Sequence, residues 1–156
     1  MHIRWRASCV SGRNQRNECV FCQKIPKELR NRLLQSSEDI LACLEHFRDK
    51  KQEYFVCLSL DSGKRLIARR VVTVGLLDTA LAHPREIFAG PLIDRAASVI
   101  IAHNHPSGNP APSKQDIDTT QQIVAAGQLL GLPLRDHIIV SSDAHYSFKG
   151  HGLVLS

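Results

Sequence analysis

The sequence of 156 residues has no apolar run that approaches the ~20 residues needed to cross a membrane as a helix, so no membrane protein is expected. Basic residues near the N-terminus are not followed by an apolar stretch, so a secretory signal is not expected either. The sequence also lacks a glycine-rich phosphate-binding loop. Its five cysteines are an odd number in a chain long enough to fold without disulfides. We therefore predict a reducing, cytoplasmic setting rather than a disulfide framework.

Most of the chain has no excess of basic over acidic residues, although the net charge of the whole chain is +5 and its pI is near 9.1. Residues 1–35 hold eight basic and two acidic residues, a net charge of +6. Residues 36–156 hold 12 basic and 13 acidic residues, a net charge of −1. The first 24 residues show neither helical nor strand periodicity. The sequence therefore predicts a basic, poorly ordered leader (1–35), able to contact nucleic acid, ahead of a near-neutral domain (36–156).

Hydrophobic residues make up 43% of the chain, enough for the core of one small domain. Helix starts are predicted at Ser36, Pro84 and Ser113, each a residue type that favours the first positions of a helix. Strands are predicted over 54–60, 66–74, 97–102, 134–140 and 146–148. Because the run 97–102 is wholly apolar, it is expected to be a central strand buried on both faces. The order of elements predicts an α/β class: a small single domain with a mixed sheet flanked by helices.

The most informative segment is His103-Asn104-His105, which directly follows the apolar strand. Side chains alternate along a strand, so His103 and His105 should point to one face and could bind one cation. Asp116, in the first turn of the next predicted helix, adds a carboxylate. Two histidines and one carboxylate are three protein ligands, a number typical of a catalytic zinc site. A structural alternative stays open, because Ser113-x-x-Asp116 is also the pattern of a helix capping box.

This pattern resembles the JAMM signature of JAB/MPN-type metallopeptidases: His103-x-His105-Pro106, six residues, then Ser113-x-x-Asp116. The longer motif His-Asn-His-Pro-Ser-Gly is similar to sequences of the RadC-like branch of that family. The resemblance covers roughly residues 36–150, and further segments that resemble RadC-like sequences are 52–55, 83–88, 136–139 and 146–148. It implies the JAMM/MPN architecture, which is cytidine-deaminase-like.

The resemblance also implies a ligand set and a reaction. His103, His105 and Asp116 would bind a zinc ion. Ser113 matches the family's serine, whose hydroxyl stabilises the developing oxyanion, and it can cap the helix at the same time. The implied reaction is zinc-dependent hydrolysis of a peptide or isopeptide bond in an unidentified protein or peptide. The resemblance supplies neither the physiological substrate nor an oligomeric state.

The general acid/base of this family is a glutamate on an early strand, and two candidates stay open. Glu53 comes directly before the predicted strand 54–60, which favours it. Glu86 is the rival, although a glutamate at a helix start also has a purely electrostatic role. A different function stays open as well. RadC-like proteins have been associated with DNA repair, so the protein could act in DNA repair or on mobile elements, binding nucleic acid through residues 1–35 with the JAMM domain accessory or inactive.

One further histidine motif and the cysteines give weaker signals. Asp136-His137 could orient a ligand imidazole or could make only a structural hydrogen bond. Cys43 and Cys57 fall within apolar patterns and are predicted to lie in the core, whereas Cys19 and Cys22 form a lone pair without the four ligands of a structural zinc site.

Overall fold

The protein is described from a computed structural model, which covers residue 25, residues 27–75 and residues 82–154. Its strands are β1 (Tyr54–Leu60), β2 (Leu66–Val74), β3 (Ser98–Asn104), β4 (Leu134–Val140) and β5 (His145–Ser147). Its helices are α1 (Ser37–Leu44), α2 (Pro84–Ile93) and α3 (Lys114–Leu130), and two short 3-10 turns are η1 (Lys27–Leu29) and η2 (Glu45–Phe47).

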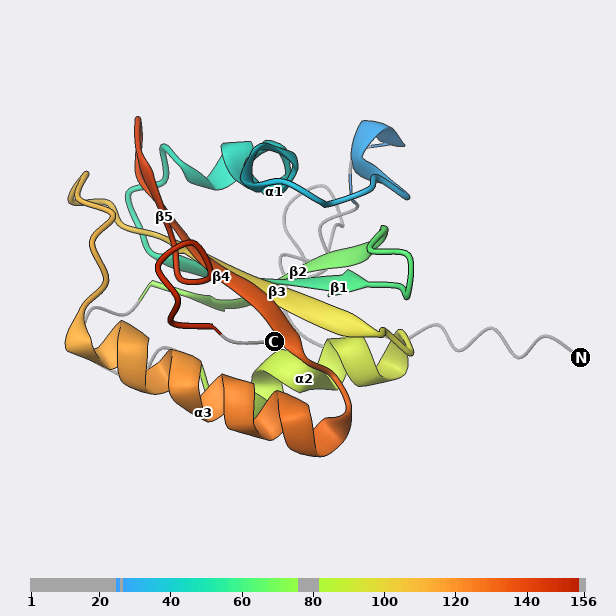
Figure 1. Cartoon of the computed structure of the whole chain (residues 1–156). Coiled ribbons are helices and arrows are strands. Elements are labelled where there is room, and N and C mark those ends of the chain that lie inside the picture. The colour runs from blue at the N-terminus through green and yellow to red at the C-terminus, as the bar shows by residue number, and fades with distance from the viewer. Residues whose placement is uncertain (1–24, 26, 76–81, 155–156) are drawn as a thin grey trace, which may run out of the picture.

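The strands form one mixed sheet in the order β2-β1-β3-β4-β5. β1 pairs antiparallel with β2 and β3, β3 and β4 are parallel, and β5 is antiparallel to β4. α3 makes the crossover that parallel neighbours require. α1 lies on one face of the sheet, and α2 and α3 lie on the other (Figure 1). The predicted fold class, a small α/β domain with a mixed sheet between helices, is confirmed.

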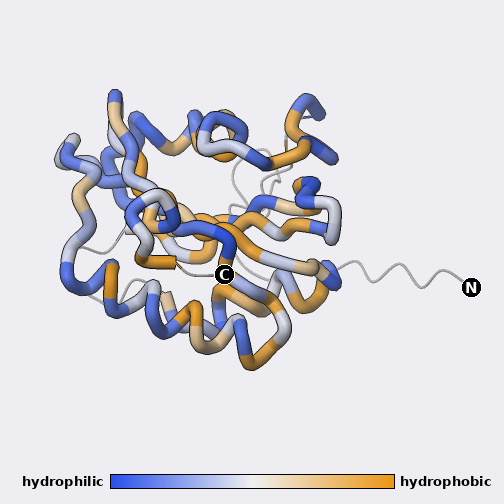
Figure 2. Tube along the Cα trace, viewed as in Figure 1, coloured by the Kyte–Doolittle hydropathy of each residue, from blue (hydrophilic) through white to orange (hydrophobic). Residues whose placement is uncertain are grey.

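Each face of the sheet has its own hydrophobic core. The core under α1 includes Ile40, Leu44, Leu58, Ile100 and Ile138. The core under α2 and α3 includes Phe55, Phe88, Ile101, Ile123 and Ile139. All seven residues of β3 are buried, because β3 has a strand on each side and helices over both faces. Figure 2 shows the result as hydrophobic colour along the central strands, with hydrophobic and hydrophilic residues alternating along α3.

The observed elements agree with the predicted ones except at a few ends. β1 and β4 have the predicted bounds, and Ser36 caps α1 through a capping box with Asp39. β3 differs, since it begins one residue later than predicted and continues two residues further, through His103 and Asn104. The extension exists because His103 and Asn104 still have backbone partners on β4, namely Ile139 and Val140. As predicted, Cys43 and Cys57 are buried and free.

The predicted leader lies largely outside the described residues, which begin with residue 25 and continue from residue 27. In the part that is described, Leu34 is buried in the core under α1, and Leu33 forms an isolated bridge with Arg65. The last residues before 36 therefore pack on the domain, while the division of the chain at residue 36 stays a prediction. Among the described residues, no helix combines the length and hydrophobicity needed to traverse a membrane.

Candidate metal centre

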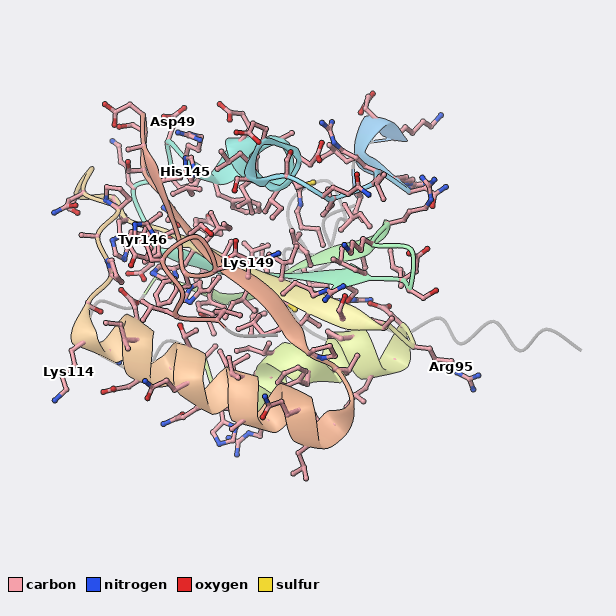
Figure 3. All side chains as sticks on the ribbon, in the orientation of Figure 1. Asp49, Arg95, Lys114, His145, Tyr146 and Lys149 are labelled. Atoms are coloured by element: carbon pink, nitrogen blue, oxygen red, sulfur yellow. The ribbon has the colours of Figure 1, made fainter. Side chains whose placement is uncertain are left out.

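The register of β1 and β3 brings the candidate residues to one face of the sheet. Phe55 pairs with His103, so the same antiparallel register places Glu53 opposite His105 just beyond the paired strands. Side chains two residues apart point to one face, and this face is the one that α3 covers. α3 begins at the end of the sheet where His103 and His105 lie. Figure 3 shows Lys114, the first residue of α3, on one side of the molecule and Arg95 on the opposite side.

Four side chains direct their polar atoms toward one another here. The Nε2 atom of His103 lies 2.9 Å from Nε2 of His105 and 3.2 Å from Oδ1 of Asp116. It also lies 3.8 Å from Oε1 of Glu53, and Oδ2 of Asp116 lies 3.5 Å from Nε2 of His105. Glu53, His103 and His105 each offer a ligand atom within 4.8 Å of the other two. This group could hold a metal ion, and imidazole nitrogen with carboxylate oxygen is a donor set that suits zinc.

The group is closed at one side and open at the other. The side chain of His103 is 0% exposed and that of Asp116 is 3% exposed, whereas His105 and Glu53 are 16% and 18% exposed. A ligand from solvent therefore reaches these atoms from the side of Glu53 and His105.

Asp116 serves the helix and the group together. Its backbone N–H donates to Oγ of Ser113 (3.1 Å), and the N–H of Ser113 donates to its Oδ2 (2.7 Å), which completes a capping box. The other oxygen, Oδ1, is the one that faces His103. The two interpretations of Ser113-x-x-Asp116 are thus compatible, because the cap fixes the carboxylate in the orientation that presents Oδ1 to His103.

Opposite charges make these groups support one another electrostatically. Burial acts to raise the pKa of Asp116, but hydrogen bonds to His103 and His105 outweigh it and hold that pKa far below its usual range. Burial acts to lower the pKa of His105, but the Asp116 carboxylate and the Asn109 carbonyl outweigh it and raise that pKa. The Asp116 carboxylate and the His105 ring therefore each favour the charged form of the other.

The two candidate glutamates lie in different places. Glu53 belongs to the group around His103. Glu86 lies in the first turn of α2, and its side chain is 60% exposed and pairs with Arg85 at 3.4 Å. Only Glu53 is therefore placed to exchange a proton with a molecule bound beside the histidines.

A family model, the RadC-like JAB domain, matches residues 34–153. The chain belongs to this family. Its sheet and helices agree with the JAB/MPN fold that the JAMM-like spacing of histidines, serine and aspartate implied.

Two relatives of this RadC-like JAB domain are each called UPF0758 protein. The one from Methanosarcina acetivorans is 41% identical over 120 residues, which are 76% of this chain and 52% of the relative. The one from Bacillus mycoides is 41% identical over 127 residues, 80% of this chain and 56% of the relative. The chain thus spans about half the length of these curated relatives.

In this RadC-like JAB domain, Asn104 is a functional candidate that the sequence analysis missed. Its side chain is fully buried and holds the segment that leads into β1. Oδ1 accepts from the N–H of Tyr54 (2.6 Å), and Nδ2 donates to the carbonyls of Gln52 (2.9 Å) and Lys50 (3.3 Å). Two of these bonds flank Glu53. The residue between the two histidines therefore ties the backbone of Glu53 to β3, a role that its place between two candidate ligands could have suggested.

Replacing Asn104 with alanine is expected to destabilise the domain by about 2–4 kcal/mol, since it removes three hydrogen bonds and leaves partly buried backbone groups unpaired. Urea unfolding measures this change. Asn109→Ala is the matched control, because the Asn109 side chain makes a single bond, to the N–H of Ala111, at an exposed site. Equal stability of the two variants would show that the Asn104 bonds do not hold the segment in place.

His137 and Thr120 extend the group into the interior of the domain. His137, on β4, is fully buried, and its Nε2 lies 2.8 Å from Nδ1 of His103. Burial first, and then the charge of His103, hold the pKa of His137 well below its usual value. The sequence analysis left the role of His137 open and did not consider Thr120, although Thr120 follows Asp116 by one helical turn.

Proposed function

We propose that this RadC-like JAB domain is a zinc-dependent hydrolase of the JAMM type that cleaves an amide bond, peptide or isopeptide, in an unidentified protein or peptide. One observation carries the proposal. Nε2 of His105 and the carboxylate oxygens of Asp116 and Glu53 all lie 2.9–3.8 Å from Nε2 of His103. Asp116 also lies 3.5 Å from Nε2 of His105. Membership of the JAB family supports it. A bound zinc ion would polarise the scissile carbonyl and lower the pKa of a coordinated water toward neutrality.

His103, His105 and Asp116 are the residues that would hold the zinc. Two imidazoles and one carboxylate are a common catalytic set, which leaves room for water or substrate. The closed side of the group belongs to His103 and Asp116, so substrate would enter from the open side. The capping box keeps Asp116 in place without help from the substrate.

Glu53 is the proposed general acid/base. Its carboxylate lies on the open side, where it can accept the proton of the attacking water and return it to the leaving amine. Such proton transfer needs a group that is held but reachable. The hydrogen bonds of Asn104 hold its backbone, and the carboxylate keeps partial exposure.

Ser113 is the proposed donor to the oxyanion. Its Oγ accepts the N–H of Asp116, so the hydroxyl hydrogen is not used by the cap. A hydroxyl donates one hydrogen and has two acceptor positions, so capping and oxyanion stabilisation can coexist. The alternative function, nucleic-acid binding through residues 1–35, stays a prediction, since residues 1–24 and 26 lie outside the described part of the chain.

A screen of zinc-loaded protein against peptide and isopeptide substrates tests the proposal. We expect hydrolysis of at least one class, loss of that hydrolysis with a chelator, and recovery when zinc is added back. Activity that a chelator leaves unchanged would contradict the proposal. So would a complete lack of hydrolysis in both classes by a protein shown to contain about one zinc per chain.

A further inference from the structure

A chain of three short hydrogen bonds runs behind the candidate metal centre. The Oγ1 atom of Thr120 lies 2.6 Å from the backbone carbonyl oxygen of Asp116 and 2.6 Å from Nδ1 of His137. The Nε2 atom of His137 lies 2.8 Å from Nδ1 of His103. The chain therefore begins at the backbone of one proposed zinc ligand and ends on the ring of another.

The chemistry of its end points gives this chain one direction. A carbonyl oxygen only accepts, so the single hydroxyl hydrogen of Thr120 is donated to Asp116. Oγ1 of Thr120 must then accept from an N–H at Nδ1 of His137. A neutral imidazole has one N–H, so Nε2 of His137 accepts, and the hydrogen between the two rings belongs to Nδ1 of His103.

The surroundings of His137 keep its ring neutral. The residue is 0% exposed, and its ring stacks on Phe148 with centroids 4.5 Å apart and lies 5.9 Å from the ring of Phe55. Among the described residues, the ring nitrogens of His137 bond to His103 and Thr120 and to no carboxylate, and Asp136 accepts only the backbone N–H of His137. A charged imidazolium in this apolar setting would lack a counter-charge in direct contact, which is costly.

We propose that Thr120 and His137 are positioning residues that fix the tautomer of His103, so that its Nε2 lone pair faces the zinc position. The inference rests on the proposed function for the metal itself. His105 is fixed independently, because its Nδ1 lies 2.9 Å from the carbonyl oxygen of Asn109 and must donate to it. The two Nε2 atoms, 2.9 Å apart, then point lone pairs at each other, an arrangement that a cation between them stabilises.

Thr120→Val tests the direction of the hydrogen-bond chain, because it removes the hydroxyl and nearly keeps the shape of the side chain. Nδ1 of His137 then loses its acceptor, and its hydrogen is free to move to Nε2. That change would place the hydrogen of His103 on Nε2, toward the metal position. Thr120→Ser is the matched control, since it keeps the hydroxyl.

Two measurements on the full chain read out the effect. We expect Thr120→Val to bind Zn²⁺ about 10–100-fold more weakly in competition with a chromophoric chelator, and Thr120→Ser to bind it as the unaltered chain does. In ¹⁵N NMR of the zinc-free protein, His103 should carry its hydrogen on Nδ1 in the unaltered chain and in Thr120→Ser, but on Nε2 in Thr120→Val. Unchanged Zn²⁺ affinity in Thr120→Val overturns the proposal, and so does a hydrogen that remains on Nδ1.

A second pair of variants covers failure of Thr120→Val to fold. His137→Gln offers a donor and an acceptor on one planar amide, whereas His137→Met offers no donor and only a weak sulfur acceptor. We expect Gln to preserve Zn²⁺ affinity better than Met, and equal affinities overturn the proposal. The proposed function fails separately: a chain that binds Zn²⁺ with the expected tautomer but hydrolyses no amide would refute the hydrolase alone.

Discussion

His103→Ala is expected to lower the zinc content from about one ion per chain to background. The His103 side chain supplies the central nitrogen of the group. The candidate ligand atoms of His105, Asp116 and Glu53 lie 2.9–3.8 Å from this nitrogen. Loss of a residue that only hydrogen-bonds to a ligand lowers metal affinity by about 10–100-fold. Loss of a ligand itself should lower zinc affinity by more than that. Elemental analysis after dialysis, together with chelator competition, measures the loss.

Asp116→Asn is the companion variant, and it separates ligation from helix capping. The amide oxygen can still accept the N–H of Ser113, while the negative charge that faces His103 is gone. Asp118→Asn on the exposed face of the same helix and His145→Ala on β5 are the matched controls. Full zinc content in His103→Ala or Asp116→Asn would refute the ligand assignment, provided that circular dichroism shows the variants folded.

Glu53→Gln is expected to reduce amide hydrolysis by about 10²–10⁴-fold while zinc content stays near one ion per chain. Glutamine keeps the size of the side chain but cannot accept and return a proton. Since Glu53 is the most exposed of the four grouped side chains, its replacement should disturb the fold little. The measurement is kcat with whichever substrate the screen identifies.

Glu86→Gln is the control that decides between the two glutamates. Its side chain is mostly exposed on α2 and pairs with Arg85, so activity should remain at the level of the unaltered chain. If Glu53→Gln kept full activity, the general acid/base role would belong to another residue. If both variants lost activity equally, the proposed division of roles between them would be wrong.

Predictions that depended on local patterns agreed well with the structure. The apolar strand before the histidines is buried on both faces, and the Ser-x-x-Asp pattern forms a capping box that starts α3. Both follow from interactions within a few residues: alternation of side chains along a strand, and hydrogen bonds within the first turn of a helix. The end of β3 was predicted less well, because polar residues can continue a strand when neighbouring strands pair with them.

By itself, the sequence determined the α/β class, the central strand, the resemblance to RadC-like proteins and the candidates His103, His105 and Asp116. The tertiary structure decided which glutamate joins them, because Glu53 meets His105 only through the register of β1 against β3, about 50 residues apart in the chain. It also decided the contacts of Asn104, Thr120 and His137. Their hydrogen bonds join separate segments, and no periodicity or spacing along the chain encodes such contacts.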